Sequence, residues 1–155
     1  MWFFLEIKHS MIQNVSHLHV YCFRHFTQNN LVTIGLMSYA TEAFFAAEDN
    51  WSKAVSLLKA SPSSPKALLP ELLNNLACVQ FENGCPRTAL QSFEEVLVLL
   101  QKNTVSTSFV ESVPSKETRL KLSITKSNIG YIHLRTRNIG SAISSFNNAL
   151  RVSKS

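Results

Sequence analysis

Apolar residues recur at steps of three and four over much of the second half of the chain, the spacing of one face of an α-helix. One such stripe falls in residues 66–82 and a second in residues 86–101. Between them, Gly84 favours the end of one helix and Pro86 favours the start of the next. The pattern therefore predicts two helices joined by a tight turn.

The same pattern returns 53 residues further along the chain. A small residue, an alanine and a phenylalanine recur at this offset: Ala77, Ala89 and Phe93 in one copy, and Gly130, Ala142 and Phe146 in the other. An earlier, weaker copy is aligned 35 residues upstream, which places Trp51 opposite Pro86 and Leu58 opposite Phe93. Self-similarity of this kind is typical of stacked repeats, so each copy is predicted to be a helical hairpin.

The predicted organisation is an N-terminal segment followed by an array of hairpins. Residues 1–32 form the segment, as an extra helix or partly disordered, and residues 33–155 form the array. The hairpins are expected at about 33–60, 66–101 and 117–153, the first with helices at 33–48 and 51–60, and an inserted loop covers 102–116. Four apolar residues are expected in the core: Leu76, Phe93, Ile129 and Phe146.

The second and third copies resemble tetratricopeptide repeats. The resemblance rests on the small–alanine–phenylalanine spacing and on the segments 73–77 and 127–131, which are most similar to the kinesin-light-chain-like branch. It implies an all-α fold in which antiparallel hairpins stack as a short right-handed superhelical solenoid. It also implies a scaffold or adaptor function without catalysis, in which a concave groove binds a peptide segment of a partner protein.

The resemblance places the peptide-binding residues on the first helices of the second and third hairpins. The candidates are Asn75, Asn128, Asn74, Cys78, Phe81, Tyr131, Arg135 and Ser127. Asn75 and Asn128 are favoured, because both precede an apolar–small pair by the same step and asparagine there clamps ligand backbone in the resembled branch. A carboxamide both donates and accepts hydrogen bonds, which suits a peptide unit. A structural role at a helix–helix contact remains the alternative.

Charge is concentrated at one end of the chain. Seven Lys/Arg and eight Asp/Glu lie in residues 1–102, against eight and two in residues 103–155. The basic third copy gives an alternative function, binding of RNA or of an acidic ligand, with a strong dependence on salt for RNA. The RNA alternative ranks lower, since Tyr131 is the only aromatic residue available there for stacking on bases.

No catalytic, cofactor-binding or metal-binding motif is found. Glycine-rich phosphate loops, nucleophile elbows and zinc-protease motifs are missing, and Asp49 is the only aspartate. His17, His19, Cys22 and His25 cluster near the N-terminus but do not converge as either a strand or a helix, so we expect no metal site. Three cysteines without paired spacing indicate free thiols.

The context of the chain is inferred from what it lacks. No apolar run is long enough to span a bilayer and no secretory signal is evident, so we expect a soluble cytoplasmic protein that does not bind membranes. The chain ends at residues 151–155 without a polar capping helix. We therefore expect a fragment, a truncated product or a core completed by a partner, with self-association through the uncapped repeat as one form of the last.

Overall fold

The structure, a computed structural model, describes residues 27–60, 66–105 and 114–154, and within these ranges it contains helices and no strands. A helix covers residues 27–40. It is followed by α2 (Phe44–Ala60), the short 3-10 helix η1 (Lys66–Leu68), α3 (Leu69–Glu82), α4 (Pro86–Val105), α5 (Lys116–Arg135) and α6 (Ile139–Lys154). The predicted all-α fold is confirmed.

Three of the turns between successive helices have the same backbone geometry. Each contains one residue with positive φ: Glu42 at 59°, Gly84 at 79° and Arg137 at 62°. The N–H of that residue donates to the carbonyl three positions back, and the next N–H donates to the carbonyl five positions back. This pair of bonds is the Schellman helix ending. The turns therefore define three equivalent helical hairpins.

The register of the first hairpin differs from the predicted one. The equivalent turn residues Glu42 and Gly84 are 42 positions apart, so the upstream offset of 35 is wrong. Trp51 is equivalent to Phe93 rather than to Pro86. The error is seven residues, about two helical turns, and a slip of that size leaves the apolar face of a helix nearly unchanged.

The helix boundaries of the first hairpin follow from the corrected register. The predicted break between residues 48 and 51 is wrong, because α2 runs through it without interruption. The turn lies instead at residues 41–43, and residues 27–32, assigned to the N-terminal segment, belong to the first helix. Nothing is described of residues 1–26. The boundaries of the second and third hairpins agree with the predicted ones to within a few residues, and α4 extends to Val105.

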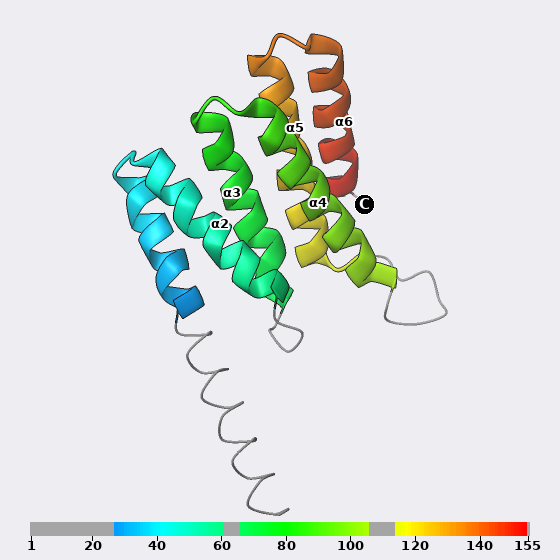
Figure 1. The fold of residues 1–155 in the computed structure, drawn as a ribbon. Coiled ribbons are helices and arrows are strands. Elements are labelled where there is room, and N and C mark those ends of the chain that lie inside the picture. The colour runs from blue at the N-terminus through cyan, green and yellow to red at the C-terminus, as the bar shows by residue number, and fades with distance from the viewer. Residues whose placement is uncertain (1–26, 61–65, 106–113, 155) are drawn as a thin grey trace, which may run out of the picture.

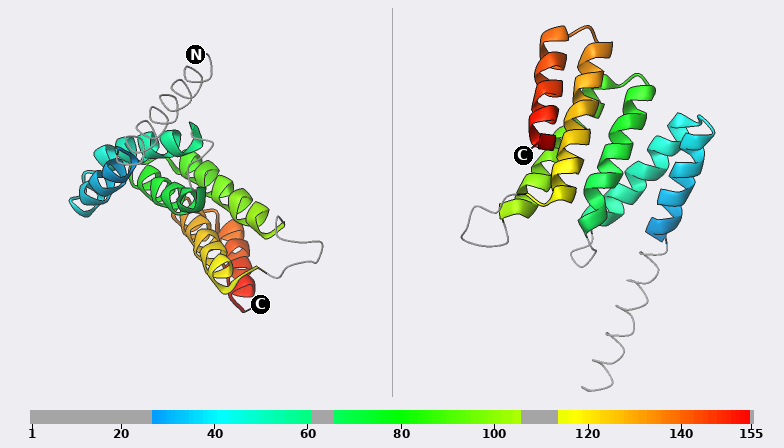
Figure 2. Two further views of the ribbon diagram at one scale, coloured as in Figure 1. Left: turned by 90° about the horizontal axis from the view of Figure 1, so that it is seen from below. Right: turned by 180° about the vertical axis from the view of Figure 1, so that it is seen from behind.

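The hairpins lie side by side in chain order, from the 27–40 helix at one end to α6 at the other (Figures 1 and 2). Contacts between neighbouring hairpins are made by α2 with α3 and by α4 with α5. The apolar core fills these contacts, and its largest fully buried side chains are Trp51, Leu58, Leu73, Phe93 and Ile132. The first and second hairpins thus bury their apolar stripes partly inside themselves and partly against the next hairpin.

In the first hairpin, Trp51 of α2 packs against the 27–40 helix. The Trp51 side chain is 2% exposed and its indole N–H donates to the carbonyl oxygen of Val32 at 3.3 Å. It lies directly over Gly35, where a Cβ atom would stand 2.3 Å from the indole nitrogen. Only glycine leaves room for the ring at this distance.

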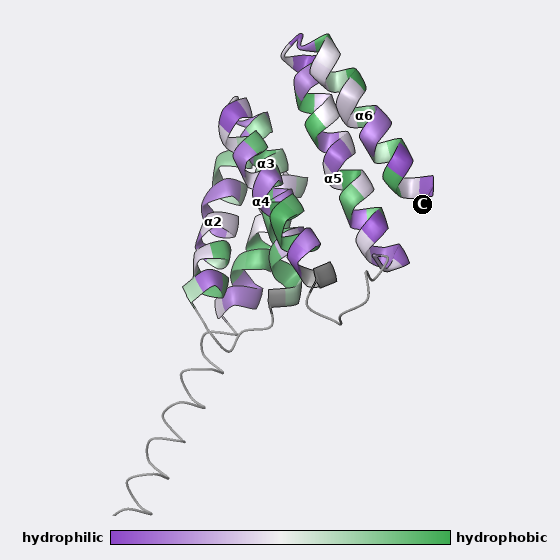
Figure 3. Cartoon of the chain, turned by 90° about the vertical axis from the view of Figure 1, so that its right-hand side faces the viewer, coloured by the Kyte–Doolittle hydropathy of each residue, from purple (hydrophilic) through white to green (hydrophobic). Residues whose placement is uncertain are grey.

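The third hairpin is less covered than the sequence predicts. Leu76 and Phe93 are buried as expected, and Ile129 is half-buried. Phe146 is 39% exposed, so its assignment to the core is wrong. The physical reason is that α5 covers the equivalent face of α4, whereas no described helix covers that face of α6. Hydrophobic segments recur along α6 in Figure 3.

Candidate functional site

The candidate site is the face formed by α3 and α5, the first helices of the second and third hairpins. Contacts join the two helices along their length, among them an ion pair of Glu71 with Lys121 at 2.8 Å, a hydrogen bond between Asn74 and Asn128, and a ring contact between Phe81 and Tyr131. The contacts follow the same order along both helices, so α3 and α5 run parallel. On α3 the three residues are three or seven positions apart, which puts them on one side of the helix.

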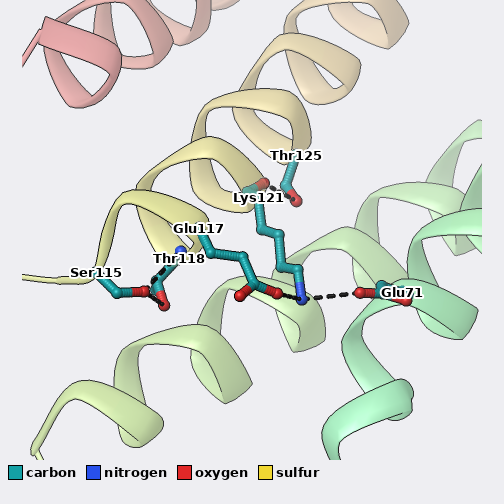
Figure 4. A network of polar contacts seen from close by, with 6 residues as sticks. All are labelled: Glu71, Ser115, Glu117, Thr118, Lys121 and Thr125. Carbon is teal, nitrogen blue, oxygen red and sulfur yellow. Dashed lines mark hydrogen bonds and ion pairs between the residues drawn. The ribbon is translucent and has the colours of Figure 1, made fainter.

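The first end of this face is a network of polar contacts around Lys121 (Figure 4). The Lys121 ammonium lies 2.8 Å from carboxylate oxygens of both Glu71 and Glu117. Hydrogen bonding to Glu117 and then to Glu71 raises the pKa of Lys121, and hydrogen bonding to Lys121 lowers the pKa of Glu117. The start of α5 is fixed by Ser115, whose hydroxyl accepts from the Thr118 N–H at 3.1 Å. Lys121 is therefore neutralised rather than available to an anionic ligand.

A first hollow of about 120 Å³ opens beside this network. It is lined from α3, α4 and α5 by Pro70, Glu71, Asn74, Asn75, Val96, Leu100, Lys121, Ile124 and Thr125. Asn75 is half-buried here and makes no side-chain hydrogen bond with any other residue of the described ranges. Its carboxamide thus keeps both its donors and its acceptor for a ligand.

The middle of the face is closed by a contact between two asparagines. The Asn128 side-chain amide donates to the Asn74 side-chain oxygen at 3.3 Å and lies 3.9 Å from the Cys78 sulfur. The two favoured asparagines are therefore in different situations: Asn128 bridges α5 to α3, whereas Asn75 is free in the first hollow. Their equivalent positions in the repeat do not give them equivalent contacts.

A second hollow of about 170 Å³ lies on the other side of the asparagine contact. All three hairpins line it, through Tyr39, Cys78, Phe81, Glu82, Phe93, Asn128, Tyr131 and Ile132. The Phe81 and Tyr131 rings meet edge to face with centroids 5.8 Å apart. The Arg135 guanidinium lies 6.0 Å from the Phe81 centroid and 5.7 Å from that of Tyr131, and it donates to the Tyr131 hydroxyl at 2.7 Å.

The thiol in this hollow is held in its protonated form. Burial, and then the negative charge of Glu82, raises the pKa of Cys78 to about 11. Burial also raises the pKa of Tyr39, with further contributions from Cys78 and Glu82. Because the thiolate is the reactive form of cysteine, Cys78 is poorly suited to act as a nucleophile near neutral pH.

The structure brings most of the predicted site residues to this one face, with two differences. Ser127 is half-buried on α5 but lines neither hollow. Tyr39 is not among the predicted site residues, yet it lines the second hollow together with residues of α3 and α5. The register error hid it: at the corrected offset Tyr39 is equivalent to Phe81. A signal in the sequence could have revealed this. Gly35 and Trp51 have the same spacing as Ala77 and Phe93, which gives the corrected offset.

Several basic residues of the third hairpin are already engaged within the chain. Arg119 donates to the Pro114 carbonyl at 2.9 Å and Arg151 donates to the Asn148 side chain at 3.2 Å. Lys121 is paired with two carboxylates and Arg135 lies over two rings. Several positive charges of this hairpin are thus already in contact with other groups of the chain.

The described helices carry neither a metal-binding cluster nor a membrane-spanning segment. No cluster of three or more His, Cys, Asp or Glu side chains that could hold a metal ion occurs in residues 27–60, 66–105 and 114–154. None of the described helices combines the length and the apolar character needed to cross a membrane. The cluster of His17, His19, Cys22 and His25 lies outside the described residues.

Comparison with known proteins gives no match: no protein-family model, no curated protein and no solved structure is significantly similar to the chain.

Proposed function

We propose that this protein is a non-catalytic protein-interaction module of tetratricopeptide type, which binds a peptide segment of a partner protein across the α3–α5 face. In this proposal the three hairpins are the units of a short solenoid, and the protein serves as an adaptor or scaffold. The observation that carries the proposal is the pair of hollows on one face, lined by residues from parallel helices and separated by the Asn74–Asn128 contact.

The chemistry of the face suits a peptide. Each hollow has the size of about one side chain, and free polar groups lie beside apolar walls. Asn75 can hold a peptide unit through its carboxamide whatever side chain that unit carries, while the rings of Phe81 and Tyr131 can supply selectivity. Small-molecule sites are usually larger, at roughly 300–1,000 Å³.

Selection of peptides by display tests this proposal without knowledge of the natural partner. A random library is selected against the protein, and the affinity of the tightest peptide is measured by calorimetry. We expect Asn75→Ala to lower the affinity for that peptide by about tenfold, because hydrogen bonds to a desolvated peptide unit are lost. Asn147→Ala is the matched control, because Asn147 is an exposed asparagine of α6 that lines neither hollow.

The outcome separates the face from the rest of the surface. Equal affinity for the wild type, Asn75→Ala and Asn128→Ala, all folded by circular dichroism, would place the peptide elsewhere and contradict the proposal. The alternative of RNA binding through the third hairpin predicts instead that RNA oligonucleotides bind and are lost steeply with salt.

A further inference from the structure

We propose that the second hollow receives a basic side chain, lysine or arginine, of the bound peptide. This inference rests on the proposed function and specifies the ligand of the same face. The hollow brings together the rings of Tyr39, Phe81 and Tyr131, one from each hairpin, and the carboxylate of Glu82. Aromatic ring faces attract cations, most strongly where water is partly excluded.

The Glu82 carboxylate in this hollow has no counterion in the part of the chain that the structure describes. Glu82 forms no ion pair with any residue of the described ranges, whereas Glu71, Glu95 and Glu117 are each paired with a lysine. Glu82 lines the hollow together with Cys78 and Tyr39. Its negative charge contributes, after burial, to the raised pKa of Cys78 and, after burial and Cys78, to that of Tyr39. A cation entering the hollow would therefore meet an uncompensated negative charge.

Two of these rings, Phe81 and Tyr131, already contact a cation of the chain itself. The exposed Arg135 guanidinium lies within 6.0 Å of both the Phe81 and the Tyr131 centroids. It forms no ion pair with the described carboxylates, so it is held by the rings and by one hydrogen bond to the Tyr131 hydroxyl. Two cations on the same rings would repel each other.

The incoming side chain therefore displaces Arg135. A basic side chain inside the hollow contacts both the aromatic rings and the Glu82 carboxylate, while the Arg135 side chain moves into solvent. Arg135 thus competes with the ligand, and its removal strengthens binding. An acidic ligand side chain would instead pair with Arg135, so the sign of the Arg135 effect distinguishes the two charges.

The experiment uses the tightest displayed peptide and variants of it in which each lysine or arginine is replaced by norleucine. One replacement should weaken binding to the wild type by about tenfold, the combined loss of a cation–π contact and an ion pair. In the Glu82→Gln variant the same replacement should lower the affinity for the peptide much less. Arg135→Gln should bind the unchanged peptide severalfold more tightly. Glu94→Gln, an exposed glutamate of α4, is the control and should bind as the wild type does.

Three results would overturn the inference: no norleucine replacement matters, the loss is the same in Glu82→Gln, or Arg135→Gln binds more weakly. Each is distinguishable from failure of the proposed function. If Asn75→Ala weakens the peptide while the Glu82 comparison shows no coupling, the peptide binds this face without a basic anchor. If neither asparagine variant nor Glu82→Gln changes its affinity, the face itself is not the binding site.

Discussion

Phe93 on α4 and Phe146 on α6 are equivalent residues in two copies of one hairpin, yet the first is 1% exposed and the second 39%. Both follow an alanine by four positions, Ala89 and Ala142, and both face the small residue of their partner helix. The difference lies outside the hairpins. The α4 face is covered by α5, which begins the next hairpin, whereas the same face of α6 has no described neighbour.

The comparison shows where the stability of such a chain resides. A single hairpin is too thin to enclose its own aromatic residue, so burial of that residue depends on the next hairpin. The exposed stripe of α6 consists of Ile139, Ile143, Phe146 and Leu150. These residues leave an apolar face of α6 exposed among the described helices.

Truncation of the two phenylalanines should give the largest difference between the hairpins. We expect Phe93→Ala to lower the free energy of unfolding by about 3–5 kcal/mol, the cost of deleting a fully buried ring. Phe146→Ala should cost about 1 kcal/mol or less, because a partly exposed ring removes less apolar area from water on folding. Urea unfolding followed by circular dichroism measures both.

If Phe93→Ala fails to fold, Phe93→Leu replaces it in the comparison, because it should lower the free energy of unfolding by less. Equal losses at the two sites would contradict the difference in burial. A loss at Phe146 that grows with protein concentration would show instead that a second copy covers α6 in solution, which sedimentation of the wild type at the same concentrations would confirm.

Part of this fold could be predicted from local signals. Gly84 and Pro86 fix the turn of the second hairpin, because each favours its position for a backbone reason that needs no tertiary context. The third hairpin follows from the 53-residue offset, although its own turn residue is Arg137. The predicted alignment of the first hairpin is wrong by seven residues, because helical periodicity cannot distinguish registers two turns apart.

The site required three-dimensional information. Sequence predicts which face of α3 carries Asn74 and Asn75, but which of the two meets Asn128 depends on how α3 and α5 cross. The ion pair of Glu71 with Lys121 joins residues 50 positions apart and has no signal in the spacing. The exposure of Phe146 arises because no described helix lies over that face of α6, which the repeat pattern does not encode.

A second contrast concerns the glycines beneath the aromatic residues of the first and third hairpins. We expect Gly35→Ala to lower the free energy of unfolding by about 1–3 kcal/mol, the usual cost of overpacking. The added Cβ would lie 2.3 Å from the buried Trp51 indole nitrogen. At Gly130 the Cβ would lie 2.9 Å from an edge carbon of Phe146, and that partly exposed ring can move outward.

Gly130→Ala should therefore change stability little, since the better helix propensity of alanine, up to about 1 kcal/mol, offsets the ring movement. Both substitutions lie inside helices, so their helix-propensity contributions match and the difference between them isolates packing. Thermal and urea unfolding of the two variants measure it. Equal destabilisation would mean that Phe146 is held as firmly as Trp51.

The smallest effects are expected at the turns, where the hairpins are alike and packing is not involved. Gly84 has positive φ and a Cβ there would meet no atom within 4 Å. Gly84→Ala should thus cost about 1 kcal/mol from backbone strain alone. Arg137→Gly and Glu42→Gly should each stabilise by up to about 1 kcal/mol, because both residues now adopt that strained conformation. Urea unfolding measures the change in the free energy of unfolding for both variants. Similar increases at residues 42 and 137 would show that the turns are equivalent, although the helix faces they connect are not. A decrease at either residue would contradict the shared turn geometry.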